Sequence, residues 1–97
     1  MVKHIVMFKL KGENDYCLEK ALQFKVALEA LPQQIDVLQS IEVGINQNPA
    51  EQWHLVLTAV VPTLADVDVY AKHPAHVAAA GIIADCREAR ACVDYVE

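Results

Sequence analysis

The pattern of hydrophobic and polar positions predicts a strand and then a helix in the first third of the chain. Residues 2–10 are apolar on both sides, which is typical of a strand that is covered on both faces. One side carries His4, Val6, Phe8 and Leu10, and the other carries Ile5 and Met7. Residues 16–31 change to the helical period, with Asn14 or Asp15 expected as the cap. The apolar stripe of this helix consists of Cys17, Ala21, Phe24, Leu28 and Leu31, widened by Leu18 and Leu22.

The rest of the chain predicts three more strands and a broken helix. Alternating residues indicate a strand over about 38–46, and a nearly continuous apolar run indicates another over 52–61. We expect this third strand to turn His54, Val56, Thr58 and Val60 toward the helices, and Trp53, Leu55, Leu57 and Ala59 away from them. A helix follows to Lys72 and restarts at Pro74 to run to about Ala89. Residues 90–96 form the last strand, with Cys92 and Asp94 on one face and Val93 and Tyr95 on the other.

The order of these elements, β-α-β-β-α-β, indicates an α+β protein with a ferredoxin-like fold. Right-handed crossovers give this order a four-stranded antiparallel sheet that carries its helices on one face. The 97 residues make one domain, residues 1–97. Hydrophobic residues make up 55% of the chain, and the first and third strands are apolar on both sides, so the other face of the sheet needs a cover. We therefore expect a homodimer in which two sheets close face to face.

Charge and cysteine content indicate which partners the protein lacks and in which cellular compartment it is expected. A net charge of −5 repels phosphate backbones, so we expect no nucleic-acid partner. Three cysteines without a Cys-x-x-Cys pair argue against a disulfide framework and for a reducing compartment. No apolar run is long enough to span a membrane, and the first strand lacks the features of a signal peptide. We therefore expect a cytoplasmic protein with no membrane partner.

The stretch Tyr70-Ala71-Lys72-His73-Pro74-Ala75-His76 gathers candidate chemistry at a break between two helices. Pro74 ends the incoming helix and suits the first position of the next, so His73 is the expected cap and His76 lies in the first turn. A neutral imidazole there is suited to act as a general base near pH 7, and the Tyr70 hydroxyl is suited to act as an acid or to orient a ligand. The alternative is a structural role, in which His76 fixes the break by hydrogen bonding.

The strand histidines His4 and His54 extend this hypothesis to a polar cavity between the sheet and the helices. We expect a small-molecule ligand to contact His4, Val6, Phe8, Phe24, His54 and Val56. One alternative is that the histidines are hydrogen-bonded core groups. Another is a zinc site built from His4, His54, His73 and His76. Because two histidines three residues apart across a helix start need not converge, we predict no metal site. We also predict no cofactor.

Four motifs, spread over essentially the whole chain, resemble the stress-responsive A/B barrel family, often called Dabb. They are Val2-Lys3-His4-Ile5-Val6, Glu42-Val43-Gly44-Ile45-Asn46, Tyr70-x-x-His73-Pro74-Ala75-His76-Val77 and Val93-Asp94-Tyr95. The resemblance implies a dimeric α+β barrel made of two ferredoxin-like protomers. The family includes plant stress proteins, many bacterial proteins of unassigned role and one well-understood enzyme type.

That enzyme type is olivetolic acid cyclase, which closes a linear polyketide by aldol condensation without a cofactor, and the chain is distantly similar to it. The similarity implies that Tyr70 and His76 form an acid–base pair and that Asp94 supports the catalytic histidine. It also matches His4 and His54 to the strand histidines of the cyclase, and Phe24 to one aromatic residue of its alkyl-tail pocket. We expect the last strand to be central or next to central in the sheet, so that Asp94 reaches the break between the helices from below.

Two function classes follow from these observations. The first is a small cofactor-free acid–base enzyme of the cyclase, isomerase or lyase type, which acts on a carbonyl-bearing ligand through Tyr70 and His76. The second is a stress-associated or ligand-binding dimeric barrel without turnover, in which the histidines are structural. A cavity between the sheet and the helices that reaches solvent favours the first class, and a closed, packed break favours the second.

Overall fold

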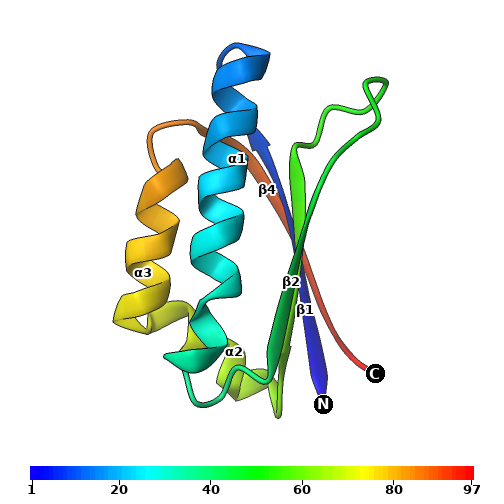
Figure 1. Ribbon diagram of the computed structural model, residues 1–97. Helices are drawn as coiled ribbons and strands as arrows, with labels where there is room; N and C mark the ends of the chain where they lie inside the picture. The colour runs from blue at the N-terminus through cyan, green and yellow to red at the C-terminus, as the bar shows by residue number, and fades with distance from the viewer.

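The computed structural model describes all 97 residues, and they form the predicted order of strands and helices. The strands are β1 (Val2–Leu10), β2 (Ser40–Ile45), β3 (Leu55–Val61) and β4 (Arg87–Val96). The helices are α1 (Asn14–Glu29), α2 (Leu64–Lys72) and α3 (Pro74–Ala80), with single 3-10 turns at Leu31–Gln33 and Gly81–Ile83. All helices lie on one side of the sheet (Figure 1), so the ferredoxin-like α+β fold is confirmed.

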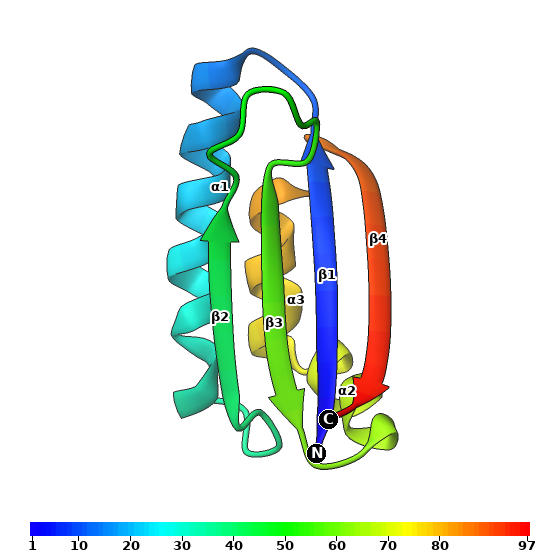
Figure 2. The ribbon, with the colours of Figure 1, turned by 90° about the vertical axis from the view of Figure 1, so that its right-hand side faces the viewer.

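The sheet has the strand order β2-β3-β1-β4, and every neighbouring pair is antiparallel. Each helical connection passes over one strand, because α1 leads from β1 to β2 across β3, while α2 and α3 lead from β3 to β4 across β1. β4 therefore lies beside the central strand β1 and forms one edge of the sheet (Figure 2).

Helix α1 packs its predicted stripe against the sheet. Cys17, Ala21, Phe24 and Leu28 are each at most 1% exposed, and Leu31 is buried just beyond the helix. Leu18 and Leu22, which were expected to widen the stripe, are 47% and 46% exposed. They lie about 100° around the helix from Cys17 and Ala21, which is enough to turn them away from the sheet. The expected side-chain cap is also absent, because the cap residue is Glu13 and its side chain makes no capping hydrogen bond.

The facing of β3 is opposite to the one expected from the sequence. Antiparallel pairing places Leu57 opposite Val6, and Val56 opposite Met7. Val6 and Leu57 are 1% and 2% exposed, so both face the helices, whereas Val56 lies on the other face. The expectation was wrong because β3 is apolar at almost every position, and such a strand carries no polar alternation that marks its buried side.

The ends of two other elements also differ from the expectation. α3 ends at Ala80, well before Ala89, and β4 begins at Arg87. A 3-10 turn at Gly81–Ile83 makes the change of direction, and the buried side chains of Ile83 and Cys86 hold the connection against the core. The earlier start of β4 adds Arg87 to the strand.

The sheet face without helices carries a band of apolar side chains. By register this band includes Ile5 and Met7 of β1, Val56 and Val60 of β3, and Val93 and Tyr95 of β4. Val93 is 62% exposed and Tyr95 is 43% exposed. Figure 2 views the sheet from this uncovered face. None of the helices is both long enough and apolar enough to cross a membrane.

Candidate functional site

The break between α2 and α3 has the geometry that its sequence predicts. His73 is extended, with φ −62° and ψ 136°, and stands between the last residue of α2 and Pro74, the first residue of α3. Its Nδ1 accepts a hydrogen bond of 3.0 Å from the backbone N–H of Ala75. The expected capping role of His73 is therefore confirmed, and this contact occupies one of its two ring nitrogens.

Tyr70 and His76 lie next to each other across this break. Their ring centroids are 4.6 Å apart with an interplanar angle of 56°. His76 Nδ1 is 2.9 Å from the carbonyl oxygen of Ala71, and because a carbonyl only accepts, Nδ1 carries the proton. The other ring nitrogen of a neutral His76, Nε2, then holds a free lone pair. Tyr70 is 1% exposed, and its hydroxyl has no hydrogen-bond partner.

Asp94 lies against His4, not against His76. The two residues are direct neighbours across β1 and β4, and His4 Nδ1 is 2.5 Å from a carboxylate oxygen of Asp94. The single hydrogen-bonded unit of Tyr70, His76 and Asp94 that the sequence suggested is therefore not formed. Ala71 provides the hydrogen bond that orients His76, and Asp94 orients His4. The His4 ring in turn meets Tyr70 edge-on, with the ring centroids 5.9 Å apart.

A cavity of about 270 Å³ joins these groups between the sheet and the helices. Of the residues expected at the site, His4, Val6, Phe8, Phe24, Tyr70, His76 and Asp94 line it. Phe8 and Phe24 meet edge-on with ring centroids 5.5 Å apart, so one wall is aromatic and apolar. The volume is close to the lower end of the range for small-molecule sites, roughly 300–1,000 Å³.

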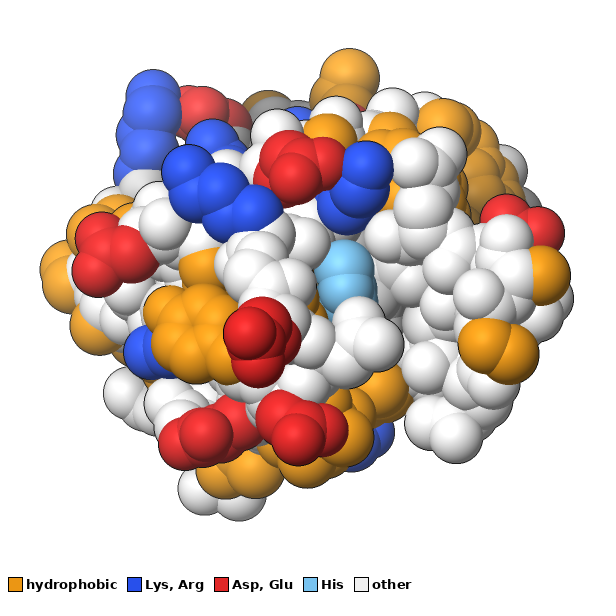
Figure 3. Space-filling view, turned by 90° about the horizontal axis from the view of Figure 1, so that it is seen from above, with side chains coloured by type: hydrophobic (Ala, Val, Ile, Leu, Met, Phe, Trp, Pro, Cys, Tyr) orange, Lys and Arg blue, Asp and Glu red, His pale blue; other side chains and the backbone are white.

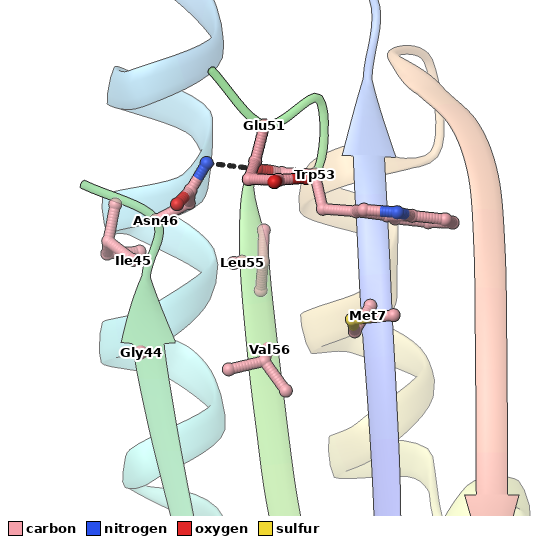
Figure 4. Close-up of a pocket in the computed structure, with 8 residues that line it drawn as sticks. All are labelled: Met7, Gly44, Ile45, Asn46, Glu51, Trp53, Leu55 and Val56. Atoms are coloured by element: carbon pink, nitrogen blue, oxygen red, sulfur yellow. Dashed lines mark hydrogen bonds between the residues drawn. The ribbon is translucent and has the colours of Figure 1, made fainter. Parts of the chain in front are cut away.

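His54 and Val56 do not belong to this cavity. His54 precedes β3, and its Nδ1 accepts a 3.0 Å hydrogen bond from the backbone N–H of Leu10 at the end of β1. Figure 3 views the molecule from above, where a histidine reaches the surface beside basic side chains. Val56 instead lines a separate hollow of about 340 Å³ on the uncovered sheet face, together with Met7 and Trp53 (Figure 4). Val56 was misplaced because the facing of β3 is reversed, whereas His54 lies before the strand, where the backbone N–H of Leu10 holds its ring outside the cavity.

The sequence model of the stress-responsive A/B barrel domain matches residues 2–97. The chain belongs to the stress-responsive A/B barrel family. The predicted family is thereby confirmed, whereas the similarity to olivetolic acid cyclase stays a prediction. No curated protein matches the sequence.

Solved structures of similar proteins share this fold over nearly the full chain. A dimeric protein of unknown function with a ferredoxin-like fold from Bacteroides fragilis is 50% identical, with 97% of this chain and 93% of that chain covered and a TM-score of 0.93. A dimeric ferredoxin-like protein of unknown function from Thermobifida fusca is 25% identical, with coverage of 99% and 90% and a TM-score of 0.80. Hydroxynitrile lyase from Passiflora edulis is 16% identical, with coverage of 97% and 90% and a TM-score of 0.76, a likeness that shows the fold alone.

The cavity of this A/B barrel protomer keeps both members of the Tyr70–His76 pair neutral. Burial lowers the pKa of His76, and neighbouring His4 and Arg90 act in the same direction, while the hydrogen bond to Ala71 opposes them. Burial also raises the pKa of Tyr70 above its ordinary value. At neutral pH, His76 therefore stands as a free base, and Tyr70 stands as a hydroxyl donor.

Cys92, Arg87 and Arg90 also line the cavity, and the sequence reasoning did not place them in the site. The period-2 facing of β4 was the signal that pointed to two of them, because Arg90 and Cys92 share a face with Asp94. Arg87 was missed because β4 was expected to begin three residues later. Burial and the neighbouring Asp94 raise the pKa of the Cys92 thiol, so this cysteine is not an activated nucleophile.

One group of side chains in the cavity has the composition of a metal site. Donor atoms of His4, Cys92 and Asp94 all lie within 4.8 Å of one another. The sulfur of Cys92 is 3.5 Å from His4 Nδ1 and 3.7 Å from the Asp94 carboxylate. The four histidines that the zinc hypothesis combined are not gathered, since His54 lies outside the cavity and His73 is occupied as a cap. Within this cluster, His4 and Asp94 are hydrogen-bonded directly to each other.

Treatment with a strong chelator is expected to leave the thermal unfolding midpoint of the protein unchanged. The core is one continuous cluster of 20 buried residues, so the fold has a hydrophobic source of stability that needs no metal. Differential scanning fluorimetry with and without EDTA or 1,10-phenanthroline provides the measurement. A clear drop that one equivalent of zinc restores would contradict the expectation, and His4→Gln would then identify the ligand cluster.

Proposed function

We propose that this protein is a small acid–base enzyme that acts on a carbonyl-bearing ligand, with His76 as the general base and Tyr70 as the acid. The observation that carries the proposal is the Tyr70 hydroxyl, which is buried, borders the cavity and has no partner. No protein group satisfies this hydroxyl, and an unsatisfied buried hydroxyl costs roughly 1–3 kcal/mol, so its partner has to come from within the cavity. A carbonyl oxygen of a ligand in the cavity supplies the missing partner.

The positions of the two groups suit proton transfer next to a carbonyl. The bond from His76 Nδ1 to Ala71 leaves Nε2 to take a proton from the carbon adjacent to the carbonyl. Tyr70 donates its hydroxyl hydrogen to the carbonyl oxygen, on which negative charge develops as that proton leaves. The lowered pKa of His76 keeps the base unprotonated, and the raised pKa of Tyr70 keeps the donor protonated.

The remaining predicted residues serve as walls and supports in this proposal. Asp94 holds one nitrogen of His4, and the ring of His4 lies edge-on to Tyr70, so Asp94 acts on the pair by positioning and not by contact. Val6, Phe8 and Phe24 present hydrocarbon to the apolar part of a ligand. His54 and Val56 were expected to contact the ligand, but they have no role in this proposal because neither residue lines this cavity.

Exchange of hydrogen for deuterium next to a carbonyl tests the proposal without knowledge of the final product. The protein is incubated in D₂O with a panel of small ketones and oxo acids, and loss of the α-proton signals is followed by NMR. We expect faster exchange of at least one compound than equimolar free imidazole produces. Binding of panel compounds without any such acceleration would instead support the second function class, a ligand-binding barrel without turnover.

The pH dependence of that exchange is expected to extend below the ordinary histidine range. The active base is the unprotonated form, and burial lowers the pKa of His76 from the usual 6.5, so most of the activity should persist at pH 6.5. The rate should then fall as the pH drops through the lowered value. On the alkaline side, the raised pKa of Tyr70 should prevent a loss of activity up to about pH 10. A midpoint at or above pH 6.5 on the acid side would argue against His76 as the base.

We infer further that two protomers pair through the uncovered sheet face. The apolar band on that face is too extensive to be left in water by a chain of 97 residues. The Bacteroides fragilis and Thermobifida fusca proteins are described as dimeric, and they share this fold at 50% and 25% identity. The cavity with Tyr70 and His76 lies on the opposite side of the sheet, so each protomer retains its own site.

A further inference from the structure

The two arginines of this chain, Arg87 and Arg90, line the same cavity. Neither forms an ion pair, because the ion pairs of the protein use Lys3, His4, Lys9, Lys25 and Lys72 as their basic members. Both side chains are exposed, so their guanidinium groups are accessible to a ligand. In a chain of net charge −5, two guanidinium groups without an ion pair at one cavity are not explained by ion-pair stabilisation of the fold.

The strand register directs both arginines to the helix-covered side of the sheet. Arg90 pairs with Phe8, and Arg87 pairs with Leu10 beyond a shift in register that follows Lys9. Phe8 and Leu10 are 6% and 3% exposed and face the helices, so their partners share that side. Arg90 lines the cavity with Tyr70 and His76, and its charge opposes the burial that raises the pKa of Tyr70 and adds to the burial that lowers the pKa of His76.

We propose that the ligand of this cavity is an oxo acid whose carboxylate is bound by Arg90 and Arg87. The inference rests on the proposed function, because it places the carboxylate at the arginines and the carbonyl at Tyr70 and His76. A guanidinium group offers two parallel N–H donors that match the two oxygens of a carboxylate. A carboxylate fits better than a phosphate, because the Asp94 carboxylate in the same cavity repels a dianion more strongly than a monoanion.

The test compares three probes that differ in charge at the arginine end. They are 3-benzoylpropanoate, its neutral methyl ester and phenylphosphonate, and binding is followed by titration in ¹⁵N–¹H correlation spectra at low and at high salt. We expect the acid to bind about 10-fold or more tightly than the ester, and the difference to shrink as salt screens the exposed arginines. Equal binding of acid and ester, or tighter binding of the phosphonate, would overturn the proposal.

Variants of Arg90 and Arg87 test whether these residues cause the preference for the acid over its methyl ester. Arg90→Gln should lower the acid-to-ester affinity ratio about 10-fold, and Arg90→Lys should restore only part of it, because lysine keeps the charge but not the paired donors. Lys20→Gln removes an equal charge from α1 outside the cavity and should leave the ratio unchanged. If Arg90→Gln and Arg87→Gln, singly and together, leave the ratio at its original value, the carboxylate site does not exist.

The test of the carboxylate site can fail or succeed independently of the test of the acid–base activity. Tyr70→Phe should keep the acid-to-ester affinity ratio while it slows exchange next to the carbonyl. A preference for the acid without any exchange would refute the activity and leave the carboxylate site in place. Exchange of the acid and the ester at equal rates and affinities would refute the carboxylate site and leave the activity in place.

Discussion

Replacement of His76 by glutamine is expected to slow the exchange next to a carbonyl by roughly 10²–10⁴-fold, which is the usual contribution of one general base. Glutamine is close in size and can still donate a hydrogen bond to the Ala71 carbonyl, so the break between α2 and α3 should persist. The amide, however, has no basic nitrogen in place of Nε2. The measurement is the initial exchange rate by NMR, together with the thermal unfolding midpoint.

His73→Gln is the matched control for this variant. His73 lies three residues earlier and serves as the helix cap, so its replacement should cost about 1 kcal/mol of stability while the exchange rate stays the same. Tyr70→Phe should slow exchange and also raise stability, because it removes a buried hydroxyl that has no partner. A His76→Gln variant that exchanges as fast as the wild type, or one that merely unfolds, would return His76 to a structural role.

Val56→Asp is expected to convert the dimer to folded monomers. Val56 lies on the uncovered face of β3, where a second sheet would bury it, and an unpaired carboxylate at such an interface costs several kcal/mol. Sedimentation at micromolar concentration should show about twice 10.7 kDa for the wild type and the protomer mass for the variant. Far-UV circular dichroism should remain unchanged, because the side chain faces away from the core of the protomer.

Leu57→Asp, one residue further along β3, is the contrasting control. Leu57 is 2% exposed and faces the helices, so the same substitution places a charge in the core of the protomer. A domain of this size is stable by only about 5–15 kcal/mol, so we expect extensive unfolding and not a clean monomer. A wild-type protein that sediments as a monomer would eliminate the barrel arrangement. If Leu57→Asp gave folded monomers and Val56→Asp unfolded, Val56 and not Leu57 would face the helices.

Local pattern was sufficient for most of the elements of this fold. The helical spacing of Cys17, Ala21, Phe24 and Leu28 predicted the face that α1 buries, because neighbours along a helix stripe must share one environment. Pro74 predicted the break and the capping role of His73, because proline cannot continue a helix and restricts the residue before it. The facing of Leu18 and Leu22 was not predictable, since apolar residues at the margin of a stripe pack only if a neighbour reaches them.

The candidate site was only partly within reach of the sequence. The pattern supplied Tyr70 and His76 as a pair, because both flank the same break and their spacing is local. The similarity to the cyclase placed Asp94 beside His76, whereas the register of β1 and β4 pairs it with His4, and register is a property of two chain segments and not of one. His54 was expected in the cavity but lies before β3. Arg87 entered the site only when the start of β4 was known, whereas Arg90 lies within the predicted strand and shares the face of Asp94 by its period of two.

By itself, the sequence determined the order of the elements, the doubly apolar strands and the break that presents Tyr70 beside His76, because these follow from residue spacing and from proline geometry. Only the tertiary structure decided which face of β3 meets the helices, which histidine Asp94 holds and which cations border the cavity. The physical reason is that a strand apolar on both sides fits either facing equally well on local grounds. Pairing with β1 removes that ambiguity, because a shift of one residue would turn Leu57 out of the core and bring Val56 into it.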